Sequence, residues 1–123
     1  MKILICEDNV IVAMSMEMTL EDLGHDSAGI VTSSDACRTA AETRDPDLVI
    51  VDLDLADGPT GLALVGWLKE RGIASIIVSG QADALDDDHG AACVLVKPVD
   101  EARLGRAIAS LADSGDALSP AES

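Results

Sequence analysis

The sequence predicts a single doubly wound α/β domain, in which a parallel β-sheet carries helices on both faces. Its 123 residues are 48% apolar, which is enough to build one buried core. Five short apolar runs alternate with stretches that have helical spacing or helix punctuation. Alternation of this kind requires right-handed crossovers and a parallel sheet.

Each predicted strand is a short, nearly continuous apolar run. The five runs are residues 3–6, 28–31, 48–51, 75–78 and 93–96. Because these runs have no polar side, both faces of the sheet should be buried under helices.

Helical patterns fill the first two intervals between these strands. The helix predicted over residues 9–23 has one apolar side, made of Val12, Met16, Leu20 and Leu23. A second helix is predicted over residues 34–44, and Pro46 follows it as a stop signal.

Two further helices are predicted in the second half of the chain. One spans residues 62–71 and ends before Gly72, the residue type that commonly follows a helix. Asp100 is the expected N-cap of the last helix. The apolar face of that helix carries Leu104, Ile108 and Leu111.

The end of the chain has a different composition. Apolar periodicity is lost from residue 113 onward, where Ser, Asp, Ala and Gly dominate. We therefore predict a domain over residues 1–113 and a disordered tail over residues 114–123.

Charge and composition argue against several classes of function. The net charge of −15 repels nucleic-acid backbones and anionic membranes, and it favours cations and basic protein surfaces as partners. The first apolar run stops at Glu7, and no apolar stretch reaches membrane-spanning length, so we expect a cytoplasmic protein without a signal peptide. The three cysteines, Cys6, Cys37 and Cys93, lack metal-type spacing and should be reduced.

Polar side chains gather where four of the predicted strands end. Ligands of open α/β sheets bind outside the carboxyl ends of the strands, at the point where the strand order reverses. Glu7 and Asp8 follow the first strand, and Asp52, Ser79 and Lys97 follow the third, fourth and fifth. Any one of them could be an ordinary capping residue, but four strands that deliver complementary chemistry to one edge favour a functional site.

This set of residues predicts a magnesium-dependent phosphoryl site. Crowded carboxylates repel one another, and a hard divalent cation such as Mg²⁺ relieves that repulsion through oxygen ligands. An aspartate can accept a phosphoryl group, and the charge that remains on its oxygens calls for a cation and a hydrogen-bond donor. Lys97 and Ser79 fit those two roles.

Four segments together resemble the receiver domain of two-component response regulators, over residue 2 to about residue 111. They are KILICEDN, PDLVIVDLDLADGPTGL, IIVSG and GAACVLVKPV. The resemblance implies a flavodoxin-like fold with a five-stranded sheet of order 2-1-3-4-5. It also implies a phosphohistidine donor, on a sensor kinase or a histidine phosphotransfer protein.

The resemblance also implies a role for each site residue. Asp52 would be the phosphoacceptor, Ser79 would hydrogen-bond the phosphoryl group, and Lys97 would pair with it. Mg²⁺ would be held by Asp52, by Asp8 directly, by Glu7 through water, and by the backbone carbonyl of Asp54. The peptide bond between Lys97 and Pro98 would be cis. Such a protein is an acceptor that can dephosphorylate itself, rather than a turnover enzyme, and it switches the binding of a downstream protein.

The resemblance is incomplete in the region that many receivers use as a switch. Val94 stands where those receivers have an aromatic residue, and valine is too short and too stiff to swing in the same way. The span from Ser79 to Lys97 is also about one helical turn shorter than is usual. We therefore expect a short or irregular fourth helix over residues 81–89, with the partner surface along it and along the fifth strand and last helix.

Two other functions remain open at this point. Asp52 and Asp54 also resemble the acid pair of a small haloacid-dehalogenase-type phosphatase, although Glu7 and Asp8 would then be unexplained. A pseudo-receiver of the same fold would bind partners without ever carrying phosphate, but such proteins usually lose an acid, the acceptor or the lysine.

Four other residues are interpreted as structural. Met14, Met16 and Met18 cluster in the first helix, where gap filling in the core is the ordinary explanation and adaptable contact with a partner is the alternative. Trp67 should be a packed helix residue.

Overall fold

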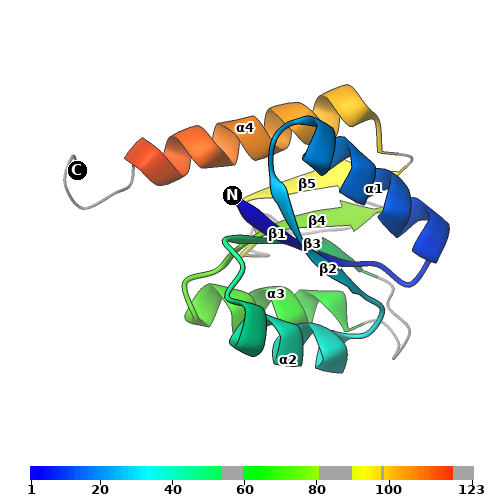
Figure 1. Ribbon diagram of the computed structural model, residues 1–123. Coiled ribbons are helices and arrows are strands. Elements are labelled where there is room, and N and C mark those ends of the chain that lie inside the picture. The colour runs from blue at the N-terminus through cyan, green and yellow to red at the C-terminus, as the bar shows by residue number, and fades with distance from the viewer. Residues whose placement is uncertain (54–59, 81–89, 98, 118–123) are drawn as a thin grey trace.

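The computed structural model describes residues 1–53, 60–80, 90–97 and 99–117. Strands and helices alternate along most of the chain (Figure 1). Their bounds are β1 Lys2–Cys6, α1 Val10–Asp22, β2 Asp26–Val31, α2 Ser34–Arg44, β3 Leu48–Asp52, α3 Gly61–Glu70, β4 Ala74–Ser79, β5 Cys93–Val96 and α4 Glu101–Ala117. No helix within these residues is both long enough and apolar enough to cross a bilayer.

All strand pairs of the sheet are parallel, and the strand order is β2-β1-β3-β4-β5. This confirms the predicted doubly wound fold. From β1 the chain moves first to one side, to β2, and then to the other side, to β3. The strand order therefore reverses between β1 and β3, and a ligand site is expected beyond their carboxyl ends.

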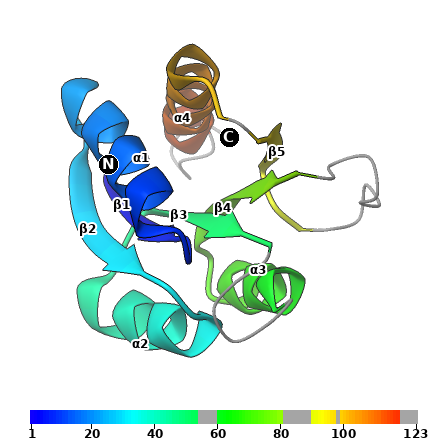
Figure 2. The same cartoon turned by 90° about the vertical axis from the view of Figure 1, so that its right-hand side faces the viewer.

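The helices form one layer on each face of the sheet (Figure 2). Helices α2 and α3 cover one face, where they pack on side chains such as Leu4, Val49 and Ile77. Helices α1 and α4 cover the other face, which includes Ile5 and Ile50. With helices on both sides, the near-continuous apolar character of the strands is explained by burial.

The starts of α1 and α2 are set by side-chain caps. The carboxamide oxygen of Asn9 accepts hydrogen bonds from the backbone N–H groups of Ile11 and Val12, at 3.1 and 3.2 Å. The hydroxyl of Ser33 accepts one from Ala36 N–H, at 3.1 Å. Each cap satisfies backbone donors that have no partner within the helix.

Some element boundaries differ from the prediction. Helix α1 ends at Asp22, and α4 continues past the predicted domain boundary at residue 113 to Ala117. Apolar periodicity marks the packed face of a helix and does not determine its last residue. The predicted fourth helix over residues 81–89, the cis bond before Pro98 and residues 118–123 of the predicted tail lie outside the described residues.

The three cysteines are free. Cys6 and Cys37 are buried in the layer under α2 and α3, and Cys93 is partly buried in β5. Trp67 packs against the same layer, with the guanidinium of Arg71 3.7 Å from the centre of its ring. This agrees with its interpretation as a packed helix residue.

A β-bulge interrupts the pairing of β1 with β2 between Ile3 and Leu4. Gly29 lies opposite Leu4 and has a φ of +112°, a conformation that other residues rarely adopt. The Arg44 guanidinium donates a 2.8 Å hydrogen bond to the carbonyl of Ala28 and occupies the space that a β-carbon at Gly29 would need. The bulge therefore requires glycine for both backbone and steric reasons.

Replacing this glycine should destabilise the domain. For Gly29→Ala we expect the free energy of unfolding to fall by about 1–3 kcal/mol, because alanine strains at this φ and displaces Arg44. Gly66→Ala is the matched control, since Gly66 lies within α3 with nothing near its missing β-carbon. That variant should be neutral or more stable by up to about 1 kcal/mol. Urea denaturation of both variants checks this, and equal effects would contradict it.

Candidate functional site

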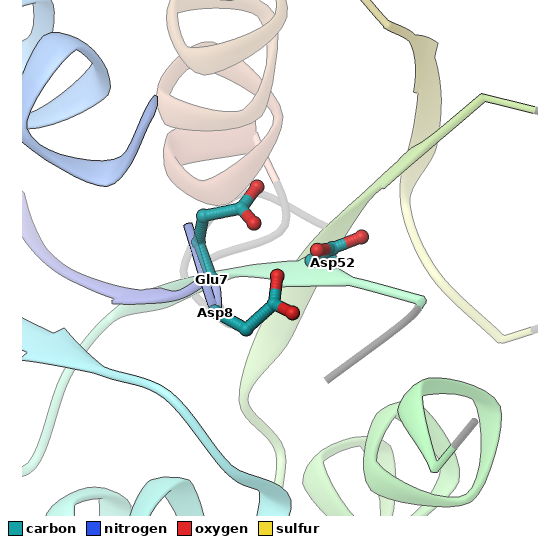
Figure 3. A group of neighbouring side chains, drawn as sticks. All are labelled: Glu7, Asp8 and Asp52. Atoms are coloured by element: carbon teal, nitrogen blue, oxygen red, sulfur yellow. The ribbon is translucent and has the colours of Figure 1, made fainter. Parts of the chain in front are cut away.

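Three carboxylates meet where β1 and β3 end (Figure 3). Glu7 and Asp8 follow β1, and Asp52 is the last residue of β3. Glu7 is 0% exposed and Asp52 is 3% exposed, whereas Asp8 is open to solvent. One oxygen of each carboxylate lies within 4.8 Å of the others. The predicted acid pair and the predicted acceptor thus form one cluster.

Lys97 lies directly against this cluster. Its Nζ is 3.3 Å from Oε1 of Glu7 and 3.2 Å from Oδ2 of Asp52. The backbone places it there, because the Lys97 N–H donates a 2.9 Å hydrogen bond to the carbonyl of Ser79 and extends the pairing of β5 with β4. Ser79 is itself buried at the end of β4. Four strands therefore bring the predicted residues to one edge.

Burial and charge perturb the two groups that face each other in this cluster. Burial, reinforced by the hydrogen bonding and charge of Asp52, raises the pKa of Glu7 to about 7. Burial alone would lower the pKa of Lys97, but the carboxylates of Glu7 and Asp52 outweigh it and raise that pKa. Two buried carboxylates thus share one ammonium, and their repulsion is only partly relieved.

The donor set fits a hard divalent cation. Carboxylate oxygens are the ligands that Mg²⁺ prefers, and two or three of them with water are typical of its sites. Oε1 of Glu7 is buried and accepts no hydrogen bond from the described residues, although the Lys97 ammonium faces it. A hydrated cation would bring water protons to this oxygen, which agrees with the expectation that Glu7 acts through water. Asp54, the fourth predicted ligand, lies outside the described residues.

Asn9 belongs to the site, although we had predicted no role for it. Its backbone N–H donates a 3.1 Å hydrogen bond to Oε2 of Glu7, while its side chain caps α1. An Asn immediately before an apolar helical run is an N-cap signal that the sequence does contain. The bond to Glu7 has no such signal, because it depends on the conformation of a buried side chain.

An exposed apolar surface borders the site. Four side chains of α1 form it, and we call them the α1 stripe: Val10, Ile11, Met14 and Met18. Ile11 is 81% exposed and Met18 is 64% exposed. The gap-filling interpretation is thus confirmed for Met16, which is buried, but it was wrong for Met14 and Met18.

A groove joins the α1 stripe to Lys97. Its volume is about 480 Å³, and it is lined by Ile11, Val12, Ser15, Met16, Lys97 and Val99. Ile11 belongs to both surfaces, so exposed apolar area continues from α1 to the side chain that contacts Asp52.

The family model of the response regulator receiver domain matches residues 3–109. The chain belongs to this family. Membership in it favours a receiver over the phosphatase alternative, and the sheet order of this receiver domain is the one that the sequence resemblance implied.

Individual relatives agree with this assignment. A receiver domain from Methylobacillus flagellatus, described as CheY-like, is 32% identical and superposes with a TM-score of 0.79 over 89% of this chain and 97% of that one. The receiver domain of PhyR from Erythrobacter litoralis has the same fold, with 24% identity and a TM-score of 0.80 over 91% of this chain and 89% of that one. The phyllosphere-induced regulator PhyR of Methylorubrum extorquens is 41% identical over 68 residues, which are 54% of this chain but only 26% of that protein.

The raised pKa of Glu7 predicts how the stability of the metal-free receiver domain depends on pH. Glu7 titrates near pH 7 in the folded protein but near 4.5 as a free side chain, so the folded state binds its proton more tightly. Between these two values the folded chain holds more protons than the unfolded chain, and stability contributed by this group falls as the pH rises.

Melting curves in EDTA from about pH 5 to about pH 7 measure this effect. We expect the Glu7→Gln variant to lose less stability across this range than the wild type, because glutamine does not ionise. Glu21→Gln, which removes an exposed carboxylate of α1, should follow the wild type. Parallel curves for the wild type and Glu7→Gln would contradict the prediction.

Proposed function

We propose that this receiver domain accepts a phosphoryl group from a phosphohistidine onto Asp52, in a reaction that requires Mg²⁺, and that the modification changes which protein it binds. One observation carries the proposal. The Asp52 carboxylate is buried, contacts Lys97 and belongs to a carboxylate cluster suited to a divalent cation. Among the described residues, Glu7 is the one other carboxylate of this cluster that contacts Lys97. Its two oxygens already face Lys97 and the Asn9 N–H, so Asp52 is the better acceptor.

The transfer itself requires little of the protein beyond position and charge. A carboxylate oxygen of Asp52 attacks phosphorus, the bond from phosphorus to the donor nitrogen breaks, and its electron pair stays on the donor imidazole. When held by Asp8, Asp52, the carbonyl of Asp54 and, through water, Glu7, Mg²⁺ supplies the positive charge that offsets repulsion between carboxylate and phosphoryl oxygens.

Lys97 and Ser79 act on the product. Formation of the acyl phosphate removes the negative charge of the Asp52 carboxylate, so the Lys97 ammonium, 3.2 Å from Oδ2 beforehand, becomes available to the phosphoryl oxygens. The Ser79 hydroxyl, at the end of β4, donates a hydrogen bond to another oxygen of the phosphoryl group. With Val94 in place of an aromatic residue, the response is carried by backbone and loop movement rather than by rotation of a ring.

The donor docks on the α1 stripe and the groove beside it. This surface is apolar, exposed and continuous with Lys97, so a protein bound there brings its phosphohistidine to the edge of the sheet. The chain carries a net charge of −15, which favours a docking face with basic residues around an apolar centre. A sensor kinase or a histidine phosphotransfer protein is the class of donor. Testing every sensor kinase of the source organism for phosphotransfer identifies which one.

Labelling tests the acceptor. With acetyl phosphate and Mg²⁺, we expect the wild type to take up one phosphoryl group, measured by intact-protein mass spectrometry. Asp52→Asn should take up none, because it lacks the nucleophile, and Asp8→Ala should label only weakly, because it loses a metal ligand. Asp26→Asn, at an exposed position of β2, is the control and should label normally.

Two results would overturn the proposal. Undiminished label on Asp52→Asn would place the acceptor elsewhere. A folded wild type that takes no label from any phosphodonor in Mg²⁺ would identify the chain as a pseudo-receiver.

Docking on α1 can be separated from the chemistry. Ile11→Ala and Met18→Ala should lower kcat/KM for transfer from the cognate donor protein, by roughly tenfold for Ile11, because a buried aliphatic side chain contributes about 1.5 kcal/mol. Both should leave labelling by acetyl phosphate unchanged, since they lie outside the carboxylate cluster. Leu62→Ala removes an exposed aliphatic side chain of α3 and should have no effect on either donor. Equal losses with protein and small-molecule donors would exclude the docking role.

A further inference from the structure

Asn9 connects two features of the molecule through one residue. Its side-chain oxygen accepts from the first backbone N–H groups of α1, those of Ile11 and Val12. Its own backbone N–H donates to Oε2 of Glu7, at 3.1 Å. The residue has extended backbone dihedrals, φ −87° and ψ 105°, and it connects the segment after β1 to the first turn of α1.

The bond to Glu7 determines how that carboxylate is held. Glu7 is fully buried, and its two oxygens face different elements: Oε1 faces Lys97 from β5, and Oε2 faces Asn9. The Asn9 N–H is the backbone donor to this carboxylate, whereas Lys97 approaches it as an ion pair. If the N–H moves away, Oε2 of Glu7 loses this hydrogen bond and the carboxylate is free to rotate, so the carboxylate cluster loses the geometry that suits a hydrated cation.

We infer that Asn9 is a positioning residue of the site: its capping side chain holds the start of α1, and so keeps its backbone N–H on Glu7. The inference rests on the proposed function, because it assigns Glu7 a part in metal binding. Through Asn9, the α1 stripe is also linked to the carboxylate cluster. Val10 and Ile11 belong to the turn that Asn9 caps, so a partner bound on the stripe contacts the turn whose cap orients Glu7.

The chain offers a matched control for an ordinary capping defect. Ser33 caps α2 through a 3.1 Å bond from Ala36 N–H, and neither this bond nor the one that its carbonyl accepts from the Cys6 thiol involves the three carboxylates. Asn9→Ala and Ser33→Ala therefore each remove the side-chain cap of a helix, with two hydrogen bonds lost at the site and one lost away from it. Asn9→Ser keeps a neutral capping oxygen and serves as the conservative variant.

Two measurements on the full chain separate positioning from stability. Isothermal titration with Mg²⁺ should give a dissociation constant about tenfold higher for Asn9→Ala than for the wild type, as is common when a group that orients a metal ligand is lost. Asn9→Ser and Ser33→Ala should bind Mg²⁺ like the wild type, although Ser33→Ala should melt at a lower temperature, as Asn9→Ala does. Amide hydrogen exchange in metal-free buffer should show residue 9 protected in the wild type and in Asn9→Ser, but exposed in Asn9→Ala.

Wild-type Mg²⁺ affinity in a folded Asn9→Ala variant would overturn the inference, as would equal losses of affinity in Asn9→Ala and Ser33→Ala. Failure of the proposed function is a different result. In that case the wild type itself binds no Mg²⁺, and hydrogen exchange at residue 9 still decides whether the capping side chain holds the backbone on Glu7.

Discussion

The arrangement of two buried carboxylates around a single ammonium governs the organisation of this molecule. Burying a carboxylate is unfavourable unless it is paired or hydrogen-bonded, and Glu7 and Asp52 are both buried. Lys97 bridges them, with its Nζ 3.2 to 3.3 Å from an oxygen of each, and this requires β1, β3 and β5 to end at the same edge. The doubly wound sheet meets that requirement because parallel strands all present their carboxyl ends there. The charged cluster thus lies at one edge of an apolar interior, and the reactive side chains are at that edge.

Most of the fold and much of the site could be predicted from the sequence, because both depend on short-range patterns. The strands are apolar runs, and residues directly after parallel strands share one edge of the sheet, which makes Asp52 and Lys97 predictable from the sequence. The β-bulge at Gly29 could not be found in this way, since it depends on the register in which β1 pairs with β2. The bond from Asn9 to Glu7 likewise depends on a buried rotamer.

The methionines of α1 show a signal that was present and overlooked. Residues two positions apart in a helix are separated by about 200° of rotation, so side chains at alternate positions cannot all point into one core. Met14 and Met18 are four apart and share a face, whereas Met16 points the other way. The structure has Met16 buried and the other two exposed. Three methionines at this spacing therefore indicate two separate surfaces, one of which is available to a partner.

Trp67 gives the molecule an unusual optical property. It is the chain's one tryptophan, and the sequence has no tyrosine or phenylalanine, so near-ultraviolet emission comes from a single indole. That indole lies on α3, stacked beneath Arg71, in the layer that the sheet separates from α1 (Figure 2). If a ligand that binds at α1 changes this emission, the structural change has reached the opposite face of the sheet. The native chromophore thus distinguishes events confined to one face from events that reach both, without any label being attached.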